Sequence, residues 1–367
     1  QILGSDDDRI IDDAVAIETS LGTVNERIPY SYQTISGNQQ AIKAVFSAYS
    51  NKHTYGIALK SRHDNTKDLI IDPLPERVWG TYFGGTSTDL AYDAKVDASG
   101  NIIQVGSTSS TTNIASSGAF QGTFLGSTNG YIAKFNSTGQ RLWSTYFGGL
   151  GSTAITGCAL ASNGDVFLSG STTTEGLSTT GAYQTTNAGG GDAFAGRFTA
   201  NGARVWVSYL GGTGSDQALS CALDGANNLI IVGSTGSNSG IATAGSFQSF
   251  KRNSFDAFIS SFSSTGAMNW STYLGGGSSD GATSVVVANS KIFVAGNTDS
   301  DDNISTSGST MPIYGGISDG FWARFSLTGA REYATYVGGS EYDNINAIAA
   351  DASGAVVVTG ATKSTVG

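Results

Sequence analysis

The chain alternates short apolar runs with glycine- and hydroxyl-rich turns, and one such run occurs five times. Its copies read "RVWGTYFGG", "RLWSTYFGG", "RVWVSYLGG", "MNWSTYLGG" and "REYATYVGG". The aromatic third residue of the run falls at Trp79, Trp143, Trp206, Trp270 and Tyr333, in steps of 64, 63, 64 and 63 residues. A period this regular indicates one supersecondary unit copied in tandem.

Each repeat shows the pattern of four short strands. A small-residue strand such as "DQALSCALD" from Asp216 is followed by a turn and a second, apolar strand such as "NLIIVGST". After an insert of about 20 residues a third strand appears, for example "DAFISSF", and a short turn leads into the recurring run as the fourth strand. No window shows a sustained 3.6-residue apolar period, so few helices are expected. Four antiparallel strands per repeat predict an all-β fold, a β-propeller built of four-stranded blades.

The recurring run is expected to be the outermost strand of each blade. Its third-place aromatic residue and its Tyr would cover the join to the neighbouring blade. The Gly-Gly pair would let the chain turn back toward the central axis through backbone conformations with positive φ. We therefore assign the run to architecture and not to chemistry.

The chain is predicted to contain two domains. Residues 1–65 do not repeat and are expected to form a β-rich N-terminal domain, followed by the propeller over residues 66–367. The fifth repeat contains only its first two strands, so residues 66–84 are expected to supply the other two and close a five-bladed ring, with residues 78–84 outermost. A ring of six or seven blades is the competing interpretation. The sequence begins with Gln1, and we expect a signal peptide or a longer N-terminal piece upstream.

The repeats resemble a known family. "W-S-T-Y-L-G-G", an Asp four residues after the second Gly, "D-A-S-G-N-I", "D-A-F" and "S-T-G" are similar to the SBBP repeats, named for a seven-bladed β-propeller and found in secreted and surface proteins of bacteria, notably Bacteroidota. The resemblance spans roughly residues 66–367, with Thr153 in place of the Asp, "NGY" at 129–131 in place of "DAF", and Tyr333 in place of Trp. It implies an extracellular or cell-surface protein, exported in Bacteroidota often by type IX secretion.

The charge balance bears on partners. The chain has 29 acidic and 19 basic side chains, a net charge of −10 and no basic cluster, which argues against nucleic acid. Charged residues make up only 13% of the chain, a composition typical of secreted β proteins. No run of 18 apolar residues exists, so no membrane span is expected.

Candidate chemistry is sparse. His53 and His63 are the only histidines, and neither matches a metal or nucleophile pattern, so both are expected in surface loops. Cys158 and Cys221 occupy equivalent places on consecutive inner strands. Neighbouring sheets lie about 10 Å apart, which exceeds the reach of a disulfide, so both thiols are predicted to be free and buried.

One acidic cluster has the oxygen ligands that calcium prefers. It consists of Asp299, Asp301 and Asp302, but it lacks the glycine and distal Glu of an EF-hand loop. A calcium site and a solvated acidic loop are the two interpretations. No other cofactor is expected.

The long inserts at 109–129, 173–191, 236–255 and 299–318 are expected on one face, which we call the crown. Three of them contain an aligned aromatic residue and amide: Phe120 with Gln121, Tyr183 with Gln184, and Phe247 with Gln248. These six residues form either a repeated ligand platform or plugs for their own blades.

Two function classes follow. The first is a non-catalytic extracellular or cell-surface scaffold that presents Ser-, Thr- and Asn-rich loops to protein or glycan partners, within a larger surface assembly. The second is a polysaccharide-active propeller enzyme or a lectin. An enzyme would require convergent carboxylates, His or Tyr on one face, which comparison of the repeats does not reveal.

Overall fold

The computed structural model describes residues 7–11, 14–19, 22–48, 55–72 and 79–365. These residues form strands and turns and no helix, so the all-β prediction is confirmed. None of the described segments is therefore a helix long and apolar enough to cross a bilayer. The chain divides into two compact units, Gln1–Gly80 and Thr81–Gly367, and the division lies later than the predicted boundary after residue 65.

The first unit consists of small antiparallel sheets. One sheet has the order β1-β2-β3, a second has the order β5-β4-β8, and β6 pairs with β7. The strands are β1 (Asp7–Ile11), β2 (Ala14–Thr19), β3 (Gly22–Arg27), β4 (Tyr30–Ile35), β5 (Asn38–Ala41), β6 (Ala44–Ala48), β7 (Tyr55–Leu59) and β8 (Ile70–Asp72).

The second unit contains five antiparallel sheets, each made of strands consecutive in sequence. Sheet I contains β9 (Asp89–Val96), β10 (Ile102–Thr108), β11 (Asn129–Phe135) and β12 (Arg141–Phe147). Sheet II contains β13 (Thr153–Leu160), β14 (Val166–Thr172), β15 (Asp192–Phe198) and β16 (Arg204–Leu210). Sheet III contains β17 (Asp216–Leu223), β18 (Leu229–Thr235), β19 (Asp256–Phe262) and β20 (Met268–Leu274). Sheet IV contains β21 (Asp280–Ala288), β22 (Lys291–Thr298), β23 (Asp319–Ser326) and β24 (Arg331–Val337), and sheet V contains β25 (Asp343–Ala350) and β26 (Val356–Thr362). The four-strand repeat is thus confirmed in sheets I to IV.

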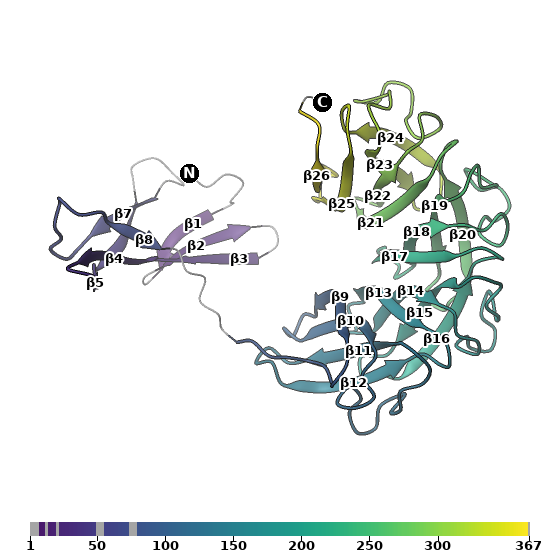
Figure 1. Cartoon of the computed structure of the whole chain (residues 1–367), viewed down its shortest axis with the longest axis horizontal. Coiled ribbons are helices and arrows are strands. Elements are labelled where there is room, and N and C mark those ends of the chain that lie inside the picture. The colour runs from purple at the N-terminus through teal and green to yellow at the C-terminus, as the bar shows by residue number, and fades with distance from the viewer. Residues whose placement is uncertain (1–6, 12–13, 20–21, 49–54, 73–78, 366–367) are drawn as a thin grey trace. The chain divides into compact units, whose positions relative to one another are not determined.

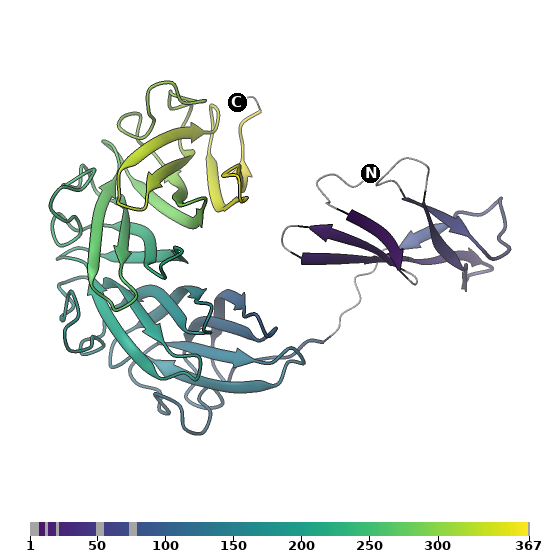
Figure 2. The ribbon, with the colours of Figure 1, turned by 180° about the vertical axis from the view of Figure 1, so that it is seen from behind.

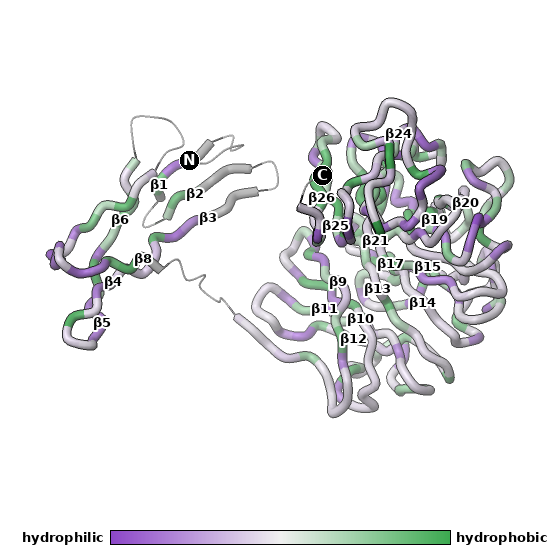
Figure 3. Tube along the Cα trace, turned by 45° about the horizontal axis from the view of Figure 1, so that its top comes forward, coloured by the Kyte–Doolittle hydropathy of each residue, from purple (hydrophilic) through white to green (hydrophobic). Residues whose placement is uncertain are grey.

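The five sheets stand side by side in a curved row. Their first strands, β9, β13, β17, β21 and β25, lie on the inner side of the curve, and the fourth strands lie on the outer side (Figures 1 and 2). Neighbouring first strands are in contact along the whole row. In Figure 3 the hydrophobic segments of this unit follow the strands, while hydrophilic segments are concentrated in the loops. The small residues predicted for the first strand therefore lie where the sheets crowd together.

The recurring run forms the fourth strand in sheets I to IV, as predicted. In sheets I to III its tryptophan joins the sheet to the next one; for example, Trp143 Nε1 donates to the Ala200 carbonyl at 3.0 Å, and Trp206 Nε1 donates to the Ser264 carbonyl at 3.0 Å. The acceptors lie in the turn between the third and fourth strands of the following sheet. Tyr146 faces the insert of its own sheet instead, and its hydroxyl donates to the Ser110 carbonyl at 2.8 Å.

The glycine pair that ends the run serves a different purpose from the one expected. In sheets I to IV both glycines of the pair have ordinary negative or extended backbone conformations, so the prediction of positive φ is wrong there. Glycine is needed at these positions because neighbouring atoms leave no room for a Cβ. A Cβ on Gly211 would lie 2.6 Å from Asp216 Oδ2 and 2.7 Å from Asp192 Oδ1, and one on Gly212 would lie 2.2 Å from a backbone oxygen.

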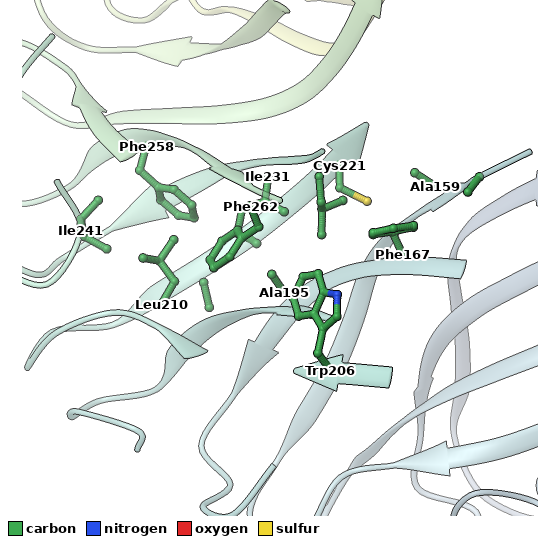
Figure 4. Close-up of a cluster of buried hydrophobic side chains, with 14 of the residues drawn as sticks. Ala159, Phe167, Ala195, Trp206, Leu210, Cys221, Ile231, Ile241, Phe258 and Phe262 are labelled. Atoms are coloured by element: carbon green, nitrogen blue, oxygen red, sulfur yellow. The ribbon is translucent and has the colours of Figure 1, made fainter. Parts of the chain in front are cut away.

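The core lies between the sheets. Figure 4 shows one cluster, in which the Trp206 indole of sheet II stacks on the Phe262 ring of sheet III with ring centroids 6.0 Å apart. Cys221 belongs to this cluster, whereas Cys158 belongs to the cluster between sheets I and II. Both cysteines are buried and free, as predicted.

Residues 66–84 differ from the expectation. Ile70–Asp72 forms β8 and pairs with β4 of the first unit, and residues 79–84 form no strand, while residues 73–78 lie outside the described part of the chain. The sequence explains the difference. Alignment with the third strands places Lys67 where they have Phe or Tyr, and it places Pro75 at the turn position of Gly202, whose φ of +81° a proline ring, fixed at about −65°, does not adopt. Phe83 still packs on sheet I, 5.2 Å from the Tyr131 ring, as Phe147 packs on sheet II.

A glycine in the turn after the third strand should limit how closely the sheets pack. Gly266 has φ +90°, and a Cβ there would lie 2.7 Å from the Trp206 ring, whereas Gly245 has φ +75° and open space around it. Both Gly→Ala changes impose the cost of a left-handed alanine, about 1–2 kcal/mol, but only Gly266→Ala also overpacks the joint, by about 1–3 kcal/mol. Urea unfolding should show a larger loss for Gly266→Ala. Equal losses for the two variants would contradict this view of the joint.

Candidate binding site

The aromatic residues of the crown inserts pack on the neighbouring sheet. The ring centroids of Phe120 and Phe198 lie 5.5 Å apart in an edge-to-face contact. Tyr183 and Phe247 make the same kind of contact with a Phe of the third strand of the next sheet. The outer edges of Phe120 and Tyr183 are exposed, at 41% and 44%. These three side chains therefore seal the joints between sheets.

The three crown glutamines are held by hydrogen bonds within their own sheet. Gln184 Nε2 donates to Asp192 Oδ2 at 2.6 Å, and its Oε1 accepts from the Gly211 N–H at 3.0 Å. Gln248 makes the equivalent pair of contacts with Asp256 and Gly275, and Gln121 makes it with Asn129 and Gly148. Both ends of each amide are thus engaged, and the glutamines clamp the third strand to the end of the fourth.

Phe247 also lines a cavity of about 600 Å³ at the rim, together with Trp270 and Arg331. The Arg331 guanidinium lies 4.3 Å over the Phe247 ring and donates to the Asn303 and Ile304 carbonyls. The Arg331 guanidinium of the same unit thus covers a face of the Phe247 ring. The structure thus does not bring the six predicted crown residues together at one point, because each pair belongs to a different sheet.

The acidic cluster does not assemble as a metal centre. Asp299, Asp301 and Asp302 are all exposed, and Asp302 Oδ1 accepts from the Gly277 N–H at 2.6 Å. Within the described ranges no three His, Cys, Asp or Glu side chains are placed to hold an ion. Of the histidines, His63 is exposed in a loop, and His53 lies outside the described residues.

A second hollow lies at the inner ends of sheets I to III, on the side of the crown. We call it the hydroxyl hollow. Its volume is about 490 Å³, and it collects the beginnings of the first strands and the ends of the second strands. Its walls are mainly Ser and Thr, with an aromatic ring from Tyr92 and an amide from Gln217; the hydroxyl residues are Thr88, Ser107, Ser109, Thr128, Ser152, Thr153, Ser171, Thr172, Thr173 and Ser215.

Several of these groups are available to a ligand. The side-chain hydroxyls of five wall residues make no hydrogen bond to other described residues; they are Thr88, Ser109, Thr128, Ser171 and Ser215. Tyr92 is 48% exposed, and its hydroxyl accepts from Ser107 Oγ at 3.3 Å. A hydroxyl both donates and accepts, so this wall suits a ligand that does the same.

The lining of the hollow contains no Lys, Arg or His and a single carboxylate, Asp216. Both oxygens of this carboxylate accept hydrogen bonds. Asp216 Oδ1 accepts from the Thr235 hydroxyl, and Oδ2 accepts from the Gly212 N–H at 2.9 Å and from Ser237 Oγ at 2.7 Å. Asp216 is buried, with no exposed surface. Its role is to tie the start of the first strand to the glycine pair, and equivalent bonds are made by Asp89, Asp280 and Asp343.

Three joints between neighbouring sheets contain two facing carboxylates: the joints of sheet II with III, III with IV, and IV with V. Asp192 lies across the Gly211 α-carbon from Asp216, and Asp256 and Asp280 face each other across Gly275 in the same way. Asp192 Oδ1, Asp256 Oδ1 and Asp319 Oδ1 are buried and have no hydrogen-bond partner among the described atoms. Burial and the neighbouring Asp216 charge raise the pKa of Asp192 from 3.8 to about 6. At the joint between sheets I and II the pair is neutral, Asn129 with Thr153.

Sequence reasoning missed the hydroxyl hollow. A signal was present, because the second strands end in "GST" in three repeats and the residues before the first-strand Asp or Thr are Ser or Thr. Each hydroxyl pair alone is typical of a turn. Only the side-by-side arrangement of three sheets turns them into one wall.

The carboxylate pairs predict a specific dependence of stability on pH. Because the pKa of Asp192 is raised in the folded state, its contribution is fully present below the ordinary value of 3.8 and is lost as the pH rises through about 6. Asp192→Asn should flatten this part of the curve and raise the free energy of unfolding at pH 7.5 by about 1 kcal/mol, since the amide resembles Asn129. Thermal unfolding from pH 4 to 8 measures both effects.

Asp216→Asn is the matched control. Both Asp216 oxygens accept hydrogen bonds, so an amide NH₂ would face a donor and destabilise the protein at every pH. Identical behaviour of the two variants would refute the assignment of distinct roles.

Comparisons with known proteins were made for the whole chain. A family model described as a domain of unknown function, DUF7948, matches residues 1–74. A comparison with curated proteins finds no match. Among solved structures the chain is similar to a protein of unknown function from Bacteroides caccae, at 10% identity and a TM-score of 0.35, covering 62% of this chain and 60% of that one. It is also similar to a structure described as the eukaryotic initiation factor, at 10% identity and a TM-score of 0.29, covering 90% of this chain and 62% of that one. The chain thus spans less than two thirds of either structure, and no functional inference rests on these likenesses.

Proposed function

We propose that the second unit is a β-propeller of the SBBP type and that the protein is a non-catalytic binding protein whose hydroxyl hollow takes a neutral, hydroxyl-rich ligand, a glycan. Support for the propeller comes from the strand order within each sheet and from first strands that touch along the inner side of the row. We keep five blades as the proposal, with six or seven as the alternatives; the structure describes four complete sheets and the two strands of sheet V.

One observation supports the ligand class most directly: the wall of the hollow combines unpaired hydroxyls with a half-exposed tyrosine and has no Lys, Arg or His. An anionic ligand would find no cation there, and the one carboxylate, Asp216, is buried and hydrogen-bonded by the fold. A sugar offers hydroxyls that complement the wall and an apolar ring face that packs on Tyr92. A volume of about 490 Å³ suits one or two sugar rings, since ligand sites span about 300–1,000 Å³.

The same geometry supports binding without catalysis. Hydrolysis of a glycosidic bond needs two carboxyl groups flanking the bond, about 5–9.5 Å apart. The hollow offers Asp216 alone, and its two oxygens hold the Thr235 and Ser237 hydroxyls and the Gly212 N–H. A buried carboxylate whose two oxygens both accept hydrogen bonds from the fold is poorly placed to exchange protons with a substrate.

We further propose that the protein acts outside the cell, at the cell surface and within a larger assembly. The low share of charged residues, 13%, and the resemblance of the repeats support this location. The net charge of −10 disfavours nucleic acid as partner. A polysaccharide-active enzyme or a lectin site on the crown remains the second candidate, and the exposed outer edges of Phe120 and Tyr183 favour the latter.

A glycan array followed by titration calorimetry tests the proposal. Tyr92→Ala should weaken binding of the best glycan at least about tenfold, because it removes the stacking surface. Tyr183→Ala, a change of an equally exposed aromatic residue outside the hollow, should leave affinity unchanged. The glycan should be recovered intact after prolonged incubation.

Two results would overturn the proposal. Cleavage of the glycan that Asp216→Asn abolishes would make the hollow an active site. Loss of binding with Tyr183→Ala but not with Tyr92→Ala would move the site to the crown inserts.

A further inference from the structure

The joint between sheets III and IV contains the cavity at the rim, which we call the rim cavity. Its volume is about 600 Å³, and it lies between the insert of sheet III, the start of β20 and the turn between β23 and β24. Two complete sheets therefore form its sides. Among the described residues that line it, Arg331 is the one charged group, and the rings of Phe247 and Trp270 lie in the same wall.

The Arg331 guanidinium has no carboxylate partner among the described residues. Other arginines of this unit are paired: Arg197 Nη2 lies 2.5 Å from Asp165 Oδ2, and Arg324 Nε lies 3.1 Å from Glu332 Oε2. Burial lowers the pKa of Arg331 below its ordinary value of 12.5, because the charged form loses hydration. A half-buried charge without a counter-ion is unfavourable, and a bound anion would offset that cost.

The fold uses one side of this guanidinium and leaves the other. Arg331 Nη1 donates to the carbonyls of Asn303 and Ile304, at 2.8 and 2.9 Å, and the flat face lies over the Phe247 ring. Nε and Nη2 make no hydrogen bond within the described part of the chain. In a guanidinium the N–H groups of Nε and Nη2 are parallel and can donate to both oxygens of one carboxylate. The packing role of Arg331 thus leaves a pair of donors that fits a carboxylate.

The equivalent joint between sheets II and III has an apolar side chain in place of the arginine. Met268 stands at the position of Arg331 and packs against the core cluster of that joint. There Trp206 is 6% exposed and stacks on Phe262 (Figure 4). Trp270, the equivalent of Trp206, is only partly buried and makes no ring contact with other described residues. The fold can therefore fill this position with an apolar side chain, and packing alone does not require a charge there.

We propose that the rim cavity is a second binding site and that it takes an acidic sugar, a glycan residue with a carboxylate. Arg331 binds the carboxylate through Nε and Nη2, and the Trp270 ring packs on the apolar face of the sugar. Asn269 is exposed at the margin, and its amide oxygen, which accepts no hydrogen bond from described residues, can accept one from a sugar hydroxyl. This site differs from the hydroxyl hollow, whose lining has no cation, and does not depend on the ligand proposed there.

The number and kind of polar groups favour this ligand over other anions. A phosphate group carries about 1.5 to 2 charges at pH 7, and sites for phosphorylated segments use clusters of arginines. One arginine matches the single charge of a carboxylate. The C-terminus of a peptide is another source of a carboxylate. However, Asn269 and Thr328, both exposed in the lining, match sugar hydroxyls better than they match the apolar side chain of a terminal residue.

The test uses the whole chain and an array of uronic acid and sialic acid oligosaccharides, each beside its methyl ester. At least one acid should bind, and titration calorimetry should show at least about tenfold weaker binding of its ester, which keeps the ring but loses the charge. Arg331→Met should weaken binding of the acid to the level of the ester. This change introduces the residue type of Met268, so the variant should fold, and thermal unfolding checks that it does.

Arg141→Met is the matched control. Arg141 Nη1 also donates to two carbonyls of its own insert, those of Asn113 and Ile114, but Arg141 does not line the rim cavity. Its replacement should leave the affinity for the acidic glycan unchanged. Tyr92→Ala, in the hydroxyl hollow, should also leave it unchanged.

Four results would overturn the proposal. They are an array on which no acid binds better than its ester, equal effects of Arg331→Met and Arg141→Met, loss of the acidic glycan with Tyr92→Ala, and equally tight binding of a short peptide through its free C-terminal carboxylate. The third result would move the acidic glycan to the hydroxyl hollow, and the fourth would make the ligand a peptide.

Discussion

The structure depends on one constraint: a β-sheet with two apolar faces must be covered on both. The second strand of sheet III makes this plain. Ile230 and Val232 belong to the cluster shared with sheet IV, and Ile231 belongs to the cluster shared with sheet II. Burial of each such side chain stabilises the fold by about 1.5–3 kcal/mol, so no sheet is stable alone. A row of sheets is the arrangement in which each neighbour covers one face, and in sheets I to III the tryptophan of the fourth strand adds a hydrogen bond to a turn of the next sheet.

This constraint also decides which side chains are left for function. The crown aromatics and glutamines have the residue types of a binding site, yet the joint between sheets uses their faces and their amides. The aspartates that begin the first strands likewise use their carboxylates within the fold, because they accept a hydrogen bond from the N–H of the glycine pair. What remains free includes the wall of hydroxyls at the inner ends of sheets I to III. The candidate binding surface therefore lies where the packing between neighbouring sheets does not use the side chains.

Much of the fold could be predicted from the sequence because the repeat is nearly regular. The 63- to 64-residue period fixed the four strands, the place of the recurring run, and the free cysteines, which are equivalent and so lie in different joints. Features that depend on partners distant in sequence could not be predicted. The role of Gln184 required knowing that Gly211 and Asp192 lie next to it, and the need for glycine at Gly211 comes from two carboxylates and not from its φ. The period alone predicts strands over residues 66–84 because it counts residues and not their types, and Lys67 stands there at the place of the Phe or Tyr that the apolar joint requires.

Native-state hydrogen exchange tests the central claim, that coverage by neighbouring sheets is what stabilises each sheet. The account predicts the highest protection in the second and third strands of sheets II and III, which are covered on both faces. It predicts much lower protection in β9, where Leu90, Tyr92 and Val96 are 46%, 48% and 66% exposed, and in β26, where Val357 is 64% exposed. Uniform protection across the five sheets, with β26 exchanging as slowly as β18, would contradict it.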